Sequence, residues 1–318
     1  MPQQSALEYL SHGQIPFFRL PSVQMSQRLP AGTRAVFLGV PFDGGTTYQP
    51  GARLAPFHIR RVSALLQGWH PGHRLQVFEK APAVDGGNVV FPPFHAGRMR
   101  ERVEAEVTAL AAVGVVPFVV GGDHSVALPA MRALAKVHGP LSVVHVDAHL
   151  DTSSAETWGE PFHHGTPLRH ALAEELIGPG QLHQVGLRGP WGDAADGELA
   201  STHGARLCGA DEVGRRGVEA VALEIRQAVG DRPVYLTFDV DAVDPAFAPG
   251  TGTPVPGGLT SREALALVRA LAGVRLVGMD LVEVCPVLDH ADLTSHLAAH
   301  LLFEGLALVA LRPAPPIR

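Results

Sequence analysis

Residues 141–151 read Leu-Ser-Val-Val-His-Val-Asp-Ala-His-Leu-Asp, and this stretch indicates both the fold class and the position of a site. Its first six residues form a short, largely apolar run rich in β-branched side chains, which is typical of a strand buried on both faces of a parallel sheet. In the last five residues, Asp147, His149 and Asp151 occupy alternate positions, so their side chains point the same way in an extended chain. We therefore expect a buried strand that ends in converging ionisable groups.

Similar apolar runs alternate with helical patterns along the chain. Strands are expected at residues 35–40, 115–120, 141–146, 184–187, 234–238 and 276–284, with weaker candidates at 76–78 or 83–85 and at 206–208. Helices are expected at residues 98–113, 126–137, 167–177, 218–229, 261–272 and 293–309, with a capping box at Thr260. This alternation predicts an α/β fold in which helices cover both faces of a mostly parallel sheet of about eight strands.

The chain shows no linker, low-complexity stretch or internal repeat that would divide it. Residues 1–33 look irregular because prolines at 16, 21 and 30 interrupt any period. We therefore expect an irregular N-terminal extension over residues 1–33 and a single catalytic domain over residues 34–318.

Composition narrows the class of protein. The 318 residues are 46% hydrophobic, which is enough for a large core, and their formal net charge of −6 argues against nucleic acid as a partner. The two cysteines cannot form a disulfide framework or a cysteine-based zinc site. No signal peptide is evident and no apolar run reaches the roughly 18 residues of a membrane span, so we expect a cytoplasmic protein without a membrane partner.

Ionisable residues follow two further predicted strands. Gly-Gly-Asp-His-Ser at 121–125 turns tightly and presents His124, although a glycine turn before a helix is by itself ambiguous. Asp239 and Asp241 occupy alternate positions after residues 234–238. The candidate metal ligands are thus His124, Asp147, His149, Asp151, Asp239 and Asp241. Four carboxylates exceed the needs of one divalent ion but suit two, and oxygen with imidazole ligands favours ions of the Mn²⁺ type.

Two other segments contain candidate catalytic residues. In Phe-His-His-Gly-Thr at 162–166, adjacent histidines point in different directions, so at most one is expected to face the site and to transfer protons. In Asp-Leu-Val-Glu-Val at 280–284, Glu283 is a candidate for facing a cationic substrate. Asp280 is expected to pair with a buried partner as ordinary structure.

Together these motifs resemble the ureohydrolase family of arginases, agmatinases and guanidino-acid hydrolases. The resemblance rests on residues 121–125, 147–151, 164–165, 239–245 and 280–284, and extends over roughly residues 34–310. Asp-Pro-Ala-Phe-Ala-Pro-Gly-Thr-Gly-Thr-Pro at 244–254 is most similar to the agmatinase-type branch. The resemblance implies a three-layer α/β/α arginase-like fold, two Mn²⁺ ions per subunit, and a homotrimer or homohexamer.

The resemblance also implies a mechanism. Water activated by the two Mn²⁺ ions attacks the guanidinium carbon of a small cationic substrate, and Asp151 accepts or relays the proton. His164 assists proton transfer around the leaving amine and Glu283 holds the guanidinium, so that urea and a primary amine are released. Replacement of Asp239 by asparagine is then expected to reduce metal occupancy and urea release together.

The substrate is the most open question. Residues 152–162 lie between Asp151 and His164, and we expect Glu156 and Trp158 there to contact the substrate, with agmatine favoured over 4-guanidinobutyrate or 3-guanidinopropionate. Glu160 belongs to the same acidic segment, whereas Arg53 or Arg188 would clamp a substrate carboxylate if either reaches the mouth. Two other functions remain open, namely a single-zinc deacetylase of the same fold and a non-catalytic homologue.

Overall fold

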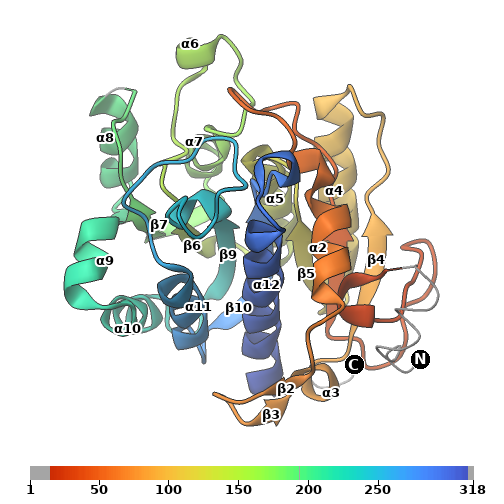
Figure 1. Ribbon diagram of the computed structural model, residues 1–318. Coiled ribbons are helices and arrows are strands. Elements are labelled where there is room, and N and C mark those ends of the chain that lie inside the picture. Colours follow the sequence, from red (N-terminus) through yellow and green to blue (C-terminus); the bar gives the residue numbers. More distant parts are fainter. Residues whose placement is uncertain (1–14, 193, 314–318) are drawn as a thin grey trace.

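The computed structural model describes residues 15–192 and 194–313. At its centre is a sheet of eight parallel strands in the order β4-β1-β5-β10-β9-β6-β7-β8 (Figure 1). The strands are β1 (Ala35–Gly39), β4 (Ala83–Asn88), β5 (Val116–Val120), β6 (Leu141–Val146), β7 (Ile177–Leu187), β8 (Arg206–Gly209), β9 (Pro233–Asp239) and β10 (Arg275–Val282). A separate antiparallel pair joins β2 (Trp69–His70) to β3 (Leu75–Gln76). The predicted parallel α/β sheet is confirmed.

Helices pack on both faces of this sheet (Figure 1). One apolar core includes residues of α2 (Ala55–Ser63), α10 (Val218–Val229), α11 (Ser261–Ala270) and α12 (Leu293–Leu311). The core on the other face includes residues of α4 (Ala96–Ala112), α5 (Ala127–His138) and α7 (Pro167–Ala173). The remaining helices are α3 (Val77–Lys80), α6 (Ala155–Trp158), α8 (Ala194–Thr202) and α9 (Ala210–Arg216). The molecule therefore has three layers, and α11 begins with the predicted capping box at Thr260.

The alternation of side chains along each strand supplies both cores. In β1, Ala35 and Phe37 belong to one core, whereas Val36 and Leu38 belong to the other, and all four are buried. Because both faces are covered by helices, such a strand is apolar at every position rather than at every second one. This burial is why the strands were recognisable as continuous apolar runs.

Besides the short elements β2, β3, α3, α6, α8 and α9, which were not predicted, strand β7 and helices α7 and α2 differ from the prediction. Strand β7 begins at Ile177 and not at residue 184, and the preceding helix ends at Ala173. Gly178-Pro179-Gly180 lies in β7 where its register against β6 shifts, and this irregularity hides the strand from pattern analysis. Helix α2 was missed because prolines flank its start, yet Pro56 lies in the first turn, where a missing N–H is tolerated.

Helix α12 is an exception to the expectation that no apolar segment is long enough to span a membrane. Its 19 residues are long and apolar enough to span a membrane by length and composition, with a mean hydropathy of 1.4. However, 83% of that window is buried inside the fold, where α12 packs against α2 and α11. The helix is therefore the central helix of one layer.

The described part of the N-terminal extension also belongs to the core. Phe17 and Phe18 are fully buried, and their rings lie 5.6 and 5.2 Å from that of Phe37 on β1. Ser22 forms an isolated parallel bridge with Asp85 of the edge strand β4. Residues 15–33 thus cover one edge of the sheet, while residues 1–14 of the predicted extension lie outside the described residues.

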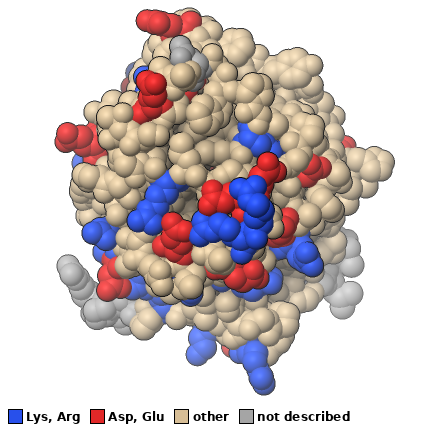
Figure 2. Space-filling view, turned by 90° about the vertical axis from the view of Figure 1, so that its left-hand side faces the viewer, with Lys and Arg blue, Asp and Glu red and all other residues tan. Residues whose placement is uncertain are grey.

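The opposite edge of the sheet is covered by charged side chains of both signs. Figure 2 shows this side of the molecule, where acidic and basic groups are interspersed. Arg216 on α9 pairs with Glu212 and Glu224, and Arg206 on the edge strand β8 also pairs with Glu224. Charged side chains on a short edge strand hinder pairing with the strands of other molecules.

Candidate active site

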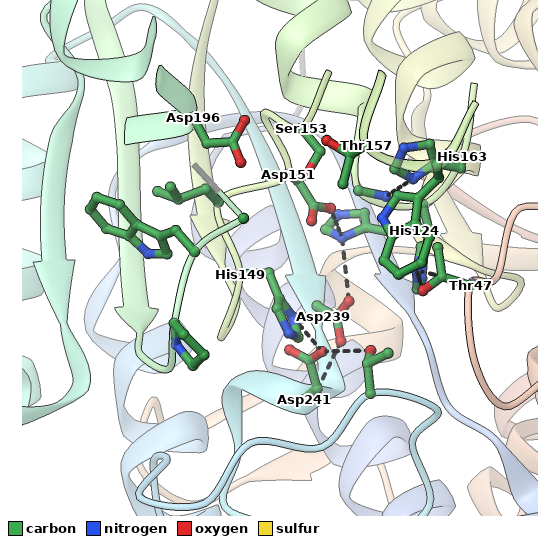
Figure 3. Close-up of a pocket in the computed structure, with 18 of the residues that line it drawn as sticks. Thr47, His124, His149, Asp151, Ser153, Thr157, His163, Asp196, Asp239 and Asp241 are labelled. Carbon is green, nitrogen blue, oxygen red and sulfur yellow. Dashed lines mark hydrogen bonds and ion pairs between the residues drawn. The ribbon is translucent and has the colours of Figure 1, made fainter. Parts of the chain in front are cut away.

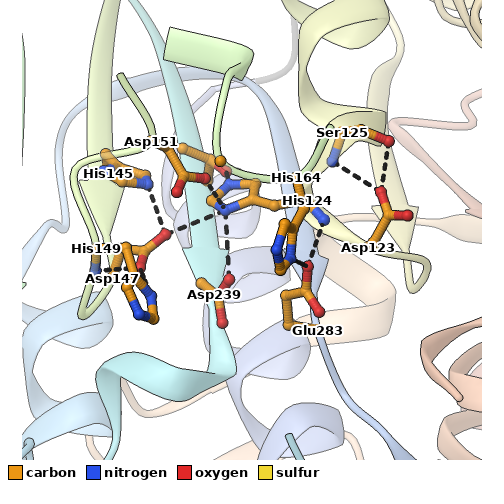
Figure 4. A network of polar contacts seen from close by, with 12 residues as sticks. Asp123, His124, Ser125, His145, Asp147, His149, Asp151, His164, Asp239 and Glu283 are labelled. Carbon is orange, nitrogen blue, oxygen red and sulfur yellow. Dashed lines mark hydrogen bonds and ion pairs between the residues drawn. The ribbon is translucent and has the colours of Figure 1, made fainter. Parts of the chain in front are cut away.

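The candidate site lies at the carboxyl ends of four neighbouring strands, β5, β10, β9 and β6 (Figure 4). In parallel sheets these ends meet at one edge, where ligands gather. Asp239 ends β9 and Asp241 follows in a short 3₁₀ turn, while the other residues lie in the loops just beyond their strands. The structure thus brings together all six predicted ligands and Glu283, namely His124, Asp147, His149, Asp151, Asp239, Asp241 and Glu283.

Two glycines after β5 turn the chain so that His124 enters the site. Gly121 and Gly122 have φ values of 78° and 83°. A Cβ on Gly121 would lie 2.6 Å from Pro56, and one on Gly122 would lie 2.7 Å from a backbone oxygen. Both positions therefore require glycine. Asp123 then accepts a hydrogen bond from the backbone N–H two residues ahead (3.0 Å), which caps the turn that carries His124.

A first cluster of side chains surrounds His124 (Figure 4). Its Nδ1 lies 2.8 Å from Asp151 Oδ2, 3.1 Å from Asp147 Oδ2 and 3.3 Å from Asp239 Oδ2. His124 and the three carboxylates are all buried. Three of these atoms, His124 Nδ1, Asp147 Oδ2 and Asp151 Oδ2, have no hydrogen-bond partner. Such a group requires positive charge at its centre.

Hydrogen bonds behind His124 indicate which of its nitrogens carries the proton. His124 Nε2 lies 2.7 Å from Thr237 Oγ1, and the Thr237 hydroxyl donates to Asp280 Oδ1 at 2.7 Å. Because the single hydroxyl proton of Thr237 goes to Asp280, we assign the imidazole proton to Nε2. His124 Nδ1 then presents a lone pair to three carboxylates, which are also acceptors. A metal cation satisfies all four groups at once, whereas one proton on Nδ1 points at only one oxygen.

A second cluster shares Asp147 with the first. His149 Nδ1 lies 3.0 Å from Asp241 Oδ2 and 3.4 Å from Asp147 Oδ1. The two carboxylate oxygens of Asp147 thus face different clusters. Oxygen and imidazole donors without thiolate, joined by a shared carboxylate, fit two neighbouring divalent ions. The residues present therefore suit a pair of metal ions of the predicted type.

The pKa values show how strongly this site requires added positive charge. Burial and then the neighbouring carboxylates of Asp241 and Asp147 raise the pKa of Asp239 well above its usual range. Burial opposes charge on His124, but Asp151 and the other carboxylates outweigh burial and raise the pKa of His124 well above its usual value. Asp241 in particular raises the pKa of His149 to about 12. Each direction indicates excess negative charge, which metal ions would balance.

His145 was missed by sequence analysis. Its Nε2 lies 2.8 Å from Asp147 Oδ2, and its Nδ1 lies 2.9 Å from Gln184 Nε2. Since Gln184 Nε2 also donates to the Leu150 carbonyl, we assign it as the donor to His145 Nδ1, which leaves the imidazole proton on Nε2. His145 Nε2 therefore faces the same Asp147 oxygen that faces His124, at ion-pair distance and without a hydrogen bond of regular geometry. Its spacing two residues before Asp147 was the available signal.

His164 connects the pocket to Glu283. His164 Nδ1 lies 2.9 Å from Glu283 Oε1, and its Nε2 lies 2.8 Å from Thr47 Oγ1. The same Glu283 oxygen accepts the backbone N–H of His124 at 2.8 Å. Burial opposes charge on His164, but Glu283 outweighs burial and the pKa of His164 rises to about 9. His164 lines the pocket, whereas Glu283 is 1% exposed and does not line it.

His163 lies in a different environment, although it also lines the pocket. Its Nδ1 accepts the backbone N–H of Gly165 at 3.1 Å. Burial, and then the nearby His164, lower the pKa of His163. The two adjacent histidines are therefore distinguished by charge: the one beside Glu283 favours the imidazolium and the other favours the neutral ring.

Above the clusters is a pocket of about 250 Å³ (Figure 3). Trp158 lines it, as predicted, and Trp191 adds a second aromatic surface. Figure 3 shows Asp196 on the far side of the cavity from Thr47, with its carboxylate directed toward Ser153 and Asp151. Ser153 and Thr157 of the predicted segment 152–162 line the pocket as well. Sequence analysis missed the other lining residues, which lie far apart along the chain and carry no recognisable motif: Thr47, Trp191, Asp196 and Thr253.

The acids and arginines that were predicted to determine substrate specificity do not contact the pocket as expected. Glu156 is exposed and does not line the pocket, and exposed Glu160 accepts the Phe162 backbone N–H instead. Arg53 pairs with Asp43, and Arg188 donates to backbone carbonyls, including those of residues 241 and 255. Neither predicted arginine clamp is free, because each already has acceptors. Both acids lie in a segment that faces solvent, and even Trp158 at the end of α6, which lines the pocket, is 61% exposed.

Comparison with known proteins agrees with this geometry. The family model described as "Arginase family" matches residues 33–307. Proclavaminate amidinohydrolase from Streptomyces clavuligerus is 45% identical over 93% of this chain and 93% of that protein. Guanidinopropionase from Pseudomonas aeruginosa is 41% identical over 92% and 91% of the two chains. Agmatinase from Proteus mirabilis is 42% identical over 86% and 87%.

The fold agrees as well. The solved structure of the Streptomyces clavuligerus proclavaminate amidinohydrolase superposes with a TM-score of 0.88, covering 98% of this chain and 99% of that one at 43% identity. The family model spans more than half of the chain, and several relatives exceed 30% identity over most of their length. The chain therefore belongs to the arginase family and is one of its metal-dependent hydrolases.

Proposed function

We propose that the chain hydrolyses a linear guanidino compound to urea and a primary amine, with two Mn²⁺ ions as cofactor and agmatine as the preferred substrate. The observation that supports it best is the pair of buried acceptor clusters that share Asp147 beneath an open pocket. His124, Asp151 and Asp239 would hold one ion, and His149 and Asp241 the other, with Asp147 facing both. Bound Mn²⁺ ions lower the pKa of water and so supply hydroxide at neutral pH.

The chain's own residues then bind the substrate and move protons. The buried carboxylate of Glu283 has His164 as its cationic partner, and the substrate's guanidinium can replace one cation by another at the same place. Loss of the Glu283 contact returns the pKa of His164 toward its ordinary value, where imidazole transfers protons efficiently near neutral pH. Asp151, which lines the pocket, accepts the proton released during attack.

The charge of the pocket supports agmatine. Among the described residues, its lining includes one carboxylate beyond the predicted metal ligands, Asp196, and one arginine, Arg188, whose guanidinium is already occupied by carbonyls. Asp196 is 5% exposed, and Arg169 Nη2 lies 3.5 Å away, beyond the length of a good hydrogen bond. A terminal ammonium would be attracted to this carboxylate, whereas a carboxylate would be repelled by it.

A second candidate is hydrolysis of a guanidino acid such as 4-guanidinobutyrate or 3-guanidinopropionate. One observation favours it: hydroxyl groups of Thr47, Ser153, Thr157 and Thr253 line the same pocket and are able to donate to a carboxylate. The names of two relatives, guanidinopropionase and proclavaminate amidinohydrolase, point in the same direction.

Urea release with added Mn²⁺ separates these candidates. We expect kcat/KM for agmatine to exceed that for 4-guanidinobutyrate. In Asp196→Asn, kcat/KM for agmatine should fall about 10-fold, the equivalent of about 1.4 kcal/mol, while the value for 4-guanidinobutyrate should rise. Glu156→Gln is the matched control, because it removes a nearby acid that lies outside the pocket. It should change kcat/KM for neither substrate by more than about 2-fold.

A wild type that prefers 4-guanidinobutyrate, with Asp196→Asn leaving the ratio unchanged, would contradict the choice of agmatine and its reason. Amide cleavage without urea release from any guanidino compound, together with one zinc ion per chain, would contradict the whole proposal and favour a deacetylase.

A further inference from the structure

The metal ligand Asp151 begins a segment held by one side chain of α7. The carbonyl oxygen of Asp151 accepts the backbone N–H groups of Leu168 and Arg169 at 3.0 and 3.3 Å. The next two carbonyls, of Thr152 and Ser153, both accept Nε–H of Arg169 at 2.8 Å. Three consecutive carbonyl groups are therefore held at the start of α7, two of them by the Arg169 side chain alone.

The same arginine connects this segment to α8. Its Nη2 lies 3.5 Å from Asp196 Oδ1, and the Thr152 hydroxyl donates to the Asp196 carbonyl at 2.8 Å. Thr152 is fully buried and Asp196 nearly so. Arg169 thus joins two neighbouring chain segments that both line the pocket, through Ser153 and Asp196.

The backbone at Asp151 needs such support. Its φ is 55°, in the left-handed region, which is strained for a residue with a Cβ. From this conformation its side chain points to His124, with Oδ2 at 2.8 Å from Nδ1. A backbone that relaxed to ordinary φ values would direct the carboxylate elsewhere.

The segment also begins the loop that carries His164. Ser153 N–H donates to the Gly165 carbonyl at 2.9 Å, so residues 153–165 form a loop whose two ends are joined. This loop contributes Thr157, Trp158 and His164 to the pocket. Ser153, the first residue of this loop, is one of the two residues whose carbonyl oxygen accepts a hydrogen bond from Arg169 Nε–H.

We propose that Arg169 is a positioning residue that holds Asp151 in its ligand conformation and fixes the start of the 153–165 loop. The proposal rests on the proposed function, since it takes Asp151 to be a ligand of Mn²⁺. Loss of the side chain removes two hydrogen bonds to carbonyl groups next to a strained residue, without removing any group that contacts metal or substrate in the proposed mechanism. Residues that orient metal ligands typically contribute 10- to 100-fold to affinity.

The test is a Mn²⁺ titration by calorimetry on the full chain after treatment with EDTA. In Arg169→Gln, one of the two Mn²⁺ sites should weaken by about 10- to 100-fold, and KM for the guanidino substrate should rise because the loop loses its support. At saturating Mn²⁺ kcat should recover more fully than KM, a split that general destabilisation would not produce. Arg169→Lys keeps the positive charge and a hydrogen-bond donor. Its Mn²⁺ affinity and its KM should lie between those of Arg169→Gln and those of the wild type.

Arg132→Gln is the matched control. Arg132 also pairs with a residue at the end of α7, donating to Glu174 at 2.7 and 2.6 Å, and its side chain is 25% exposed against 29% for Arg169. It makes no contact with residues 151–153 and should bind both ions as the wild type does. If Arg169→Gln fails to fold, a weakened site in Arg169→Lys supports the proposal.

Wild-type affinity for both ions in every folded Arg169 variant would overturn the positioning role alone, and equal weakening in Arg132→Gln would also overturn it. A wild type that binds no Mn²⁺ would overturn the proposed function together with it.

Discussion

Thr237 and Asp280 control the site without contacting the pocket. Asp280 accepts hydrogen bonds from the hydroxyl groups of Thr237 and Tyr235, as expected for a buried acid in an apolar strand. Thr237 is then left as an acceptor for His124 Nε2, so that His124 Nδ1 faces the carboxylates. A metal site therefore depends on residues behind its ligands as well as on the ligands themselves.

The two adjacent histidines lead to a residue-scale prediction. His164→Ala removes the ring beside Glu283 and should reduce kcat by about 10²- to 10⁴-fold, the usual effect of losing a positioned acid or base. Its Mn²⁺ content should stay near that of the wild type, because His164 belongs to neither acceptor cluster. His163→Ala is the control and should lose less activity. A larger loss in His163→Ala would show that the proton-transfer role was assigned to the wrong ring.

The metal ligands that sequence analysis predicted, and Glu283, lie within a few positions of a strand end. His124, Asp147 and Asp239 were recognisable because a parallel sheet brings the ends of its strands together. Trp191 and Asp196 were not, since Trp191 lies in a loop and Asp196 in the first turn of the short helix α8, and neither carries a motif that marks it. The reverse error occurred at Glu156, where an acid close to the site in sequence faces solvent.

At the scale of elements, burial decided which parts could be predicted. Strands covered on both faces are continuous apolar runs, so six of the eight were predicted firmly. Strand β7 was recognised only over its last residues, because its first half contains Gly178-Pro179-Gly180 at a register shift. Helices α8 and α9 are short and lie at the edge of the sheet, so their apolar faces are too small to produce a clear period.

Strand β7 also contains a buried histidine with a consequence for stability. His183 is 1% exposed, and neither ring nitrogen has a hydrogen-bond partner. Burial, and then Arg206, lower its pKa to about 4. The unfolded chain binds a proton at His183 near pH 6.5, whereas the folded chain does so only near pH 4. The contribution of His183 to the free energy of unfolding should therefore be constant above about pH 6.5 and fall as the pH decreases toward 4.

The measurement compares denaturant unfolding of the wild type and His183→Leu from pH 4 to 8. The difference between them should change by about 3 kcal/mol over this range, in favour of the variant at low pH. Arg206→Gln is the control for the surface charge nearby, and it should reduce the effect only slightly. Parallel pH profiles for the wild type and His183→Leu would show that His183 does not titrate as described.

At the scale of the whole molecule, the sheet and the site have opposing requirements. Two extensive apolar cores bury the sheet on both faces, which stabilises the fold, while four carboxylates lie buried where its central strands end. Metal ions bound to the folded state compensate that charge and stabilise it, by about 2.7 kcal/mol for one site at a concentration of 100 times Kd. Stability and function are therefore coupled through the metal.

Asp239→Asn tests this coupling. In the absence of metal, burial and the neighbouring carboxylates disfavour the charged form of Asp239, so the wild type should lose stability as the pH rises from about 4 through the raised pKa of this group. Asparagine has nearly the same shape and no charge. In EDTA at pH 7 the variant should therefore have a higher Tm than the wild type.

With Mn²⁺ present the order should reverse, because the wild type gains the binding free energy of its ions and the variant binds them weakly, with loss of urea release. Glu156→Gln, which removes an exposed acid outside the site, should match the wild type in both conditions. Calorimetric melting of the three proteins in EDTA and in Mn²⁺ measures the crossing directly. If Asp239→Asn were less stable than the wild type in EDTA, Asp239 would be structural rather than a group held at a cost for the metal. If the variant retained full metal content and urea release, Asp239 would not be a ligand at all.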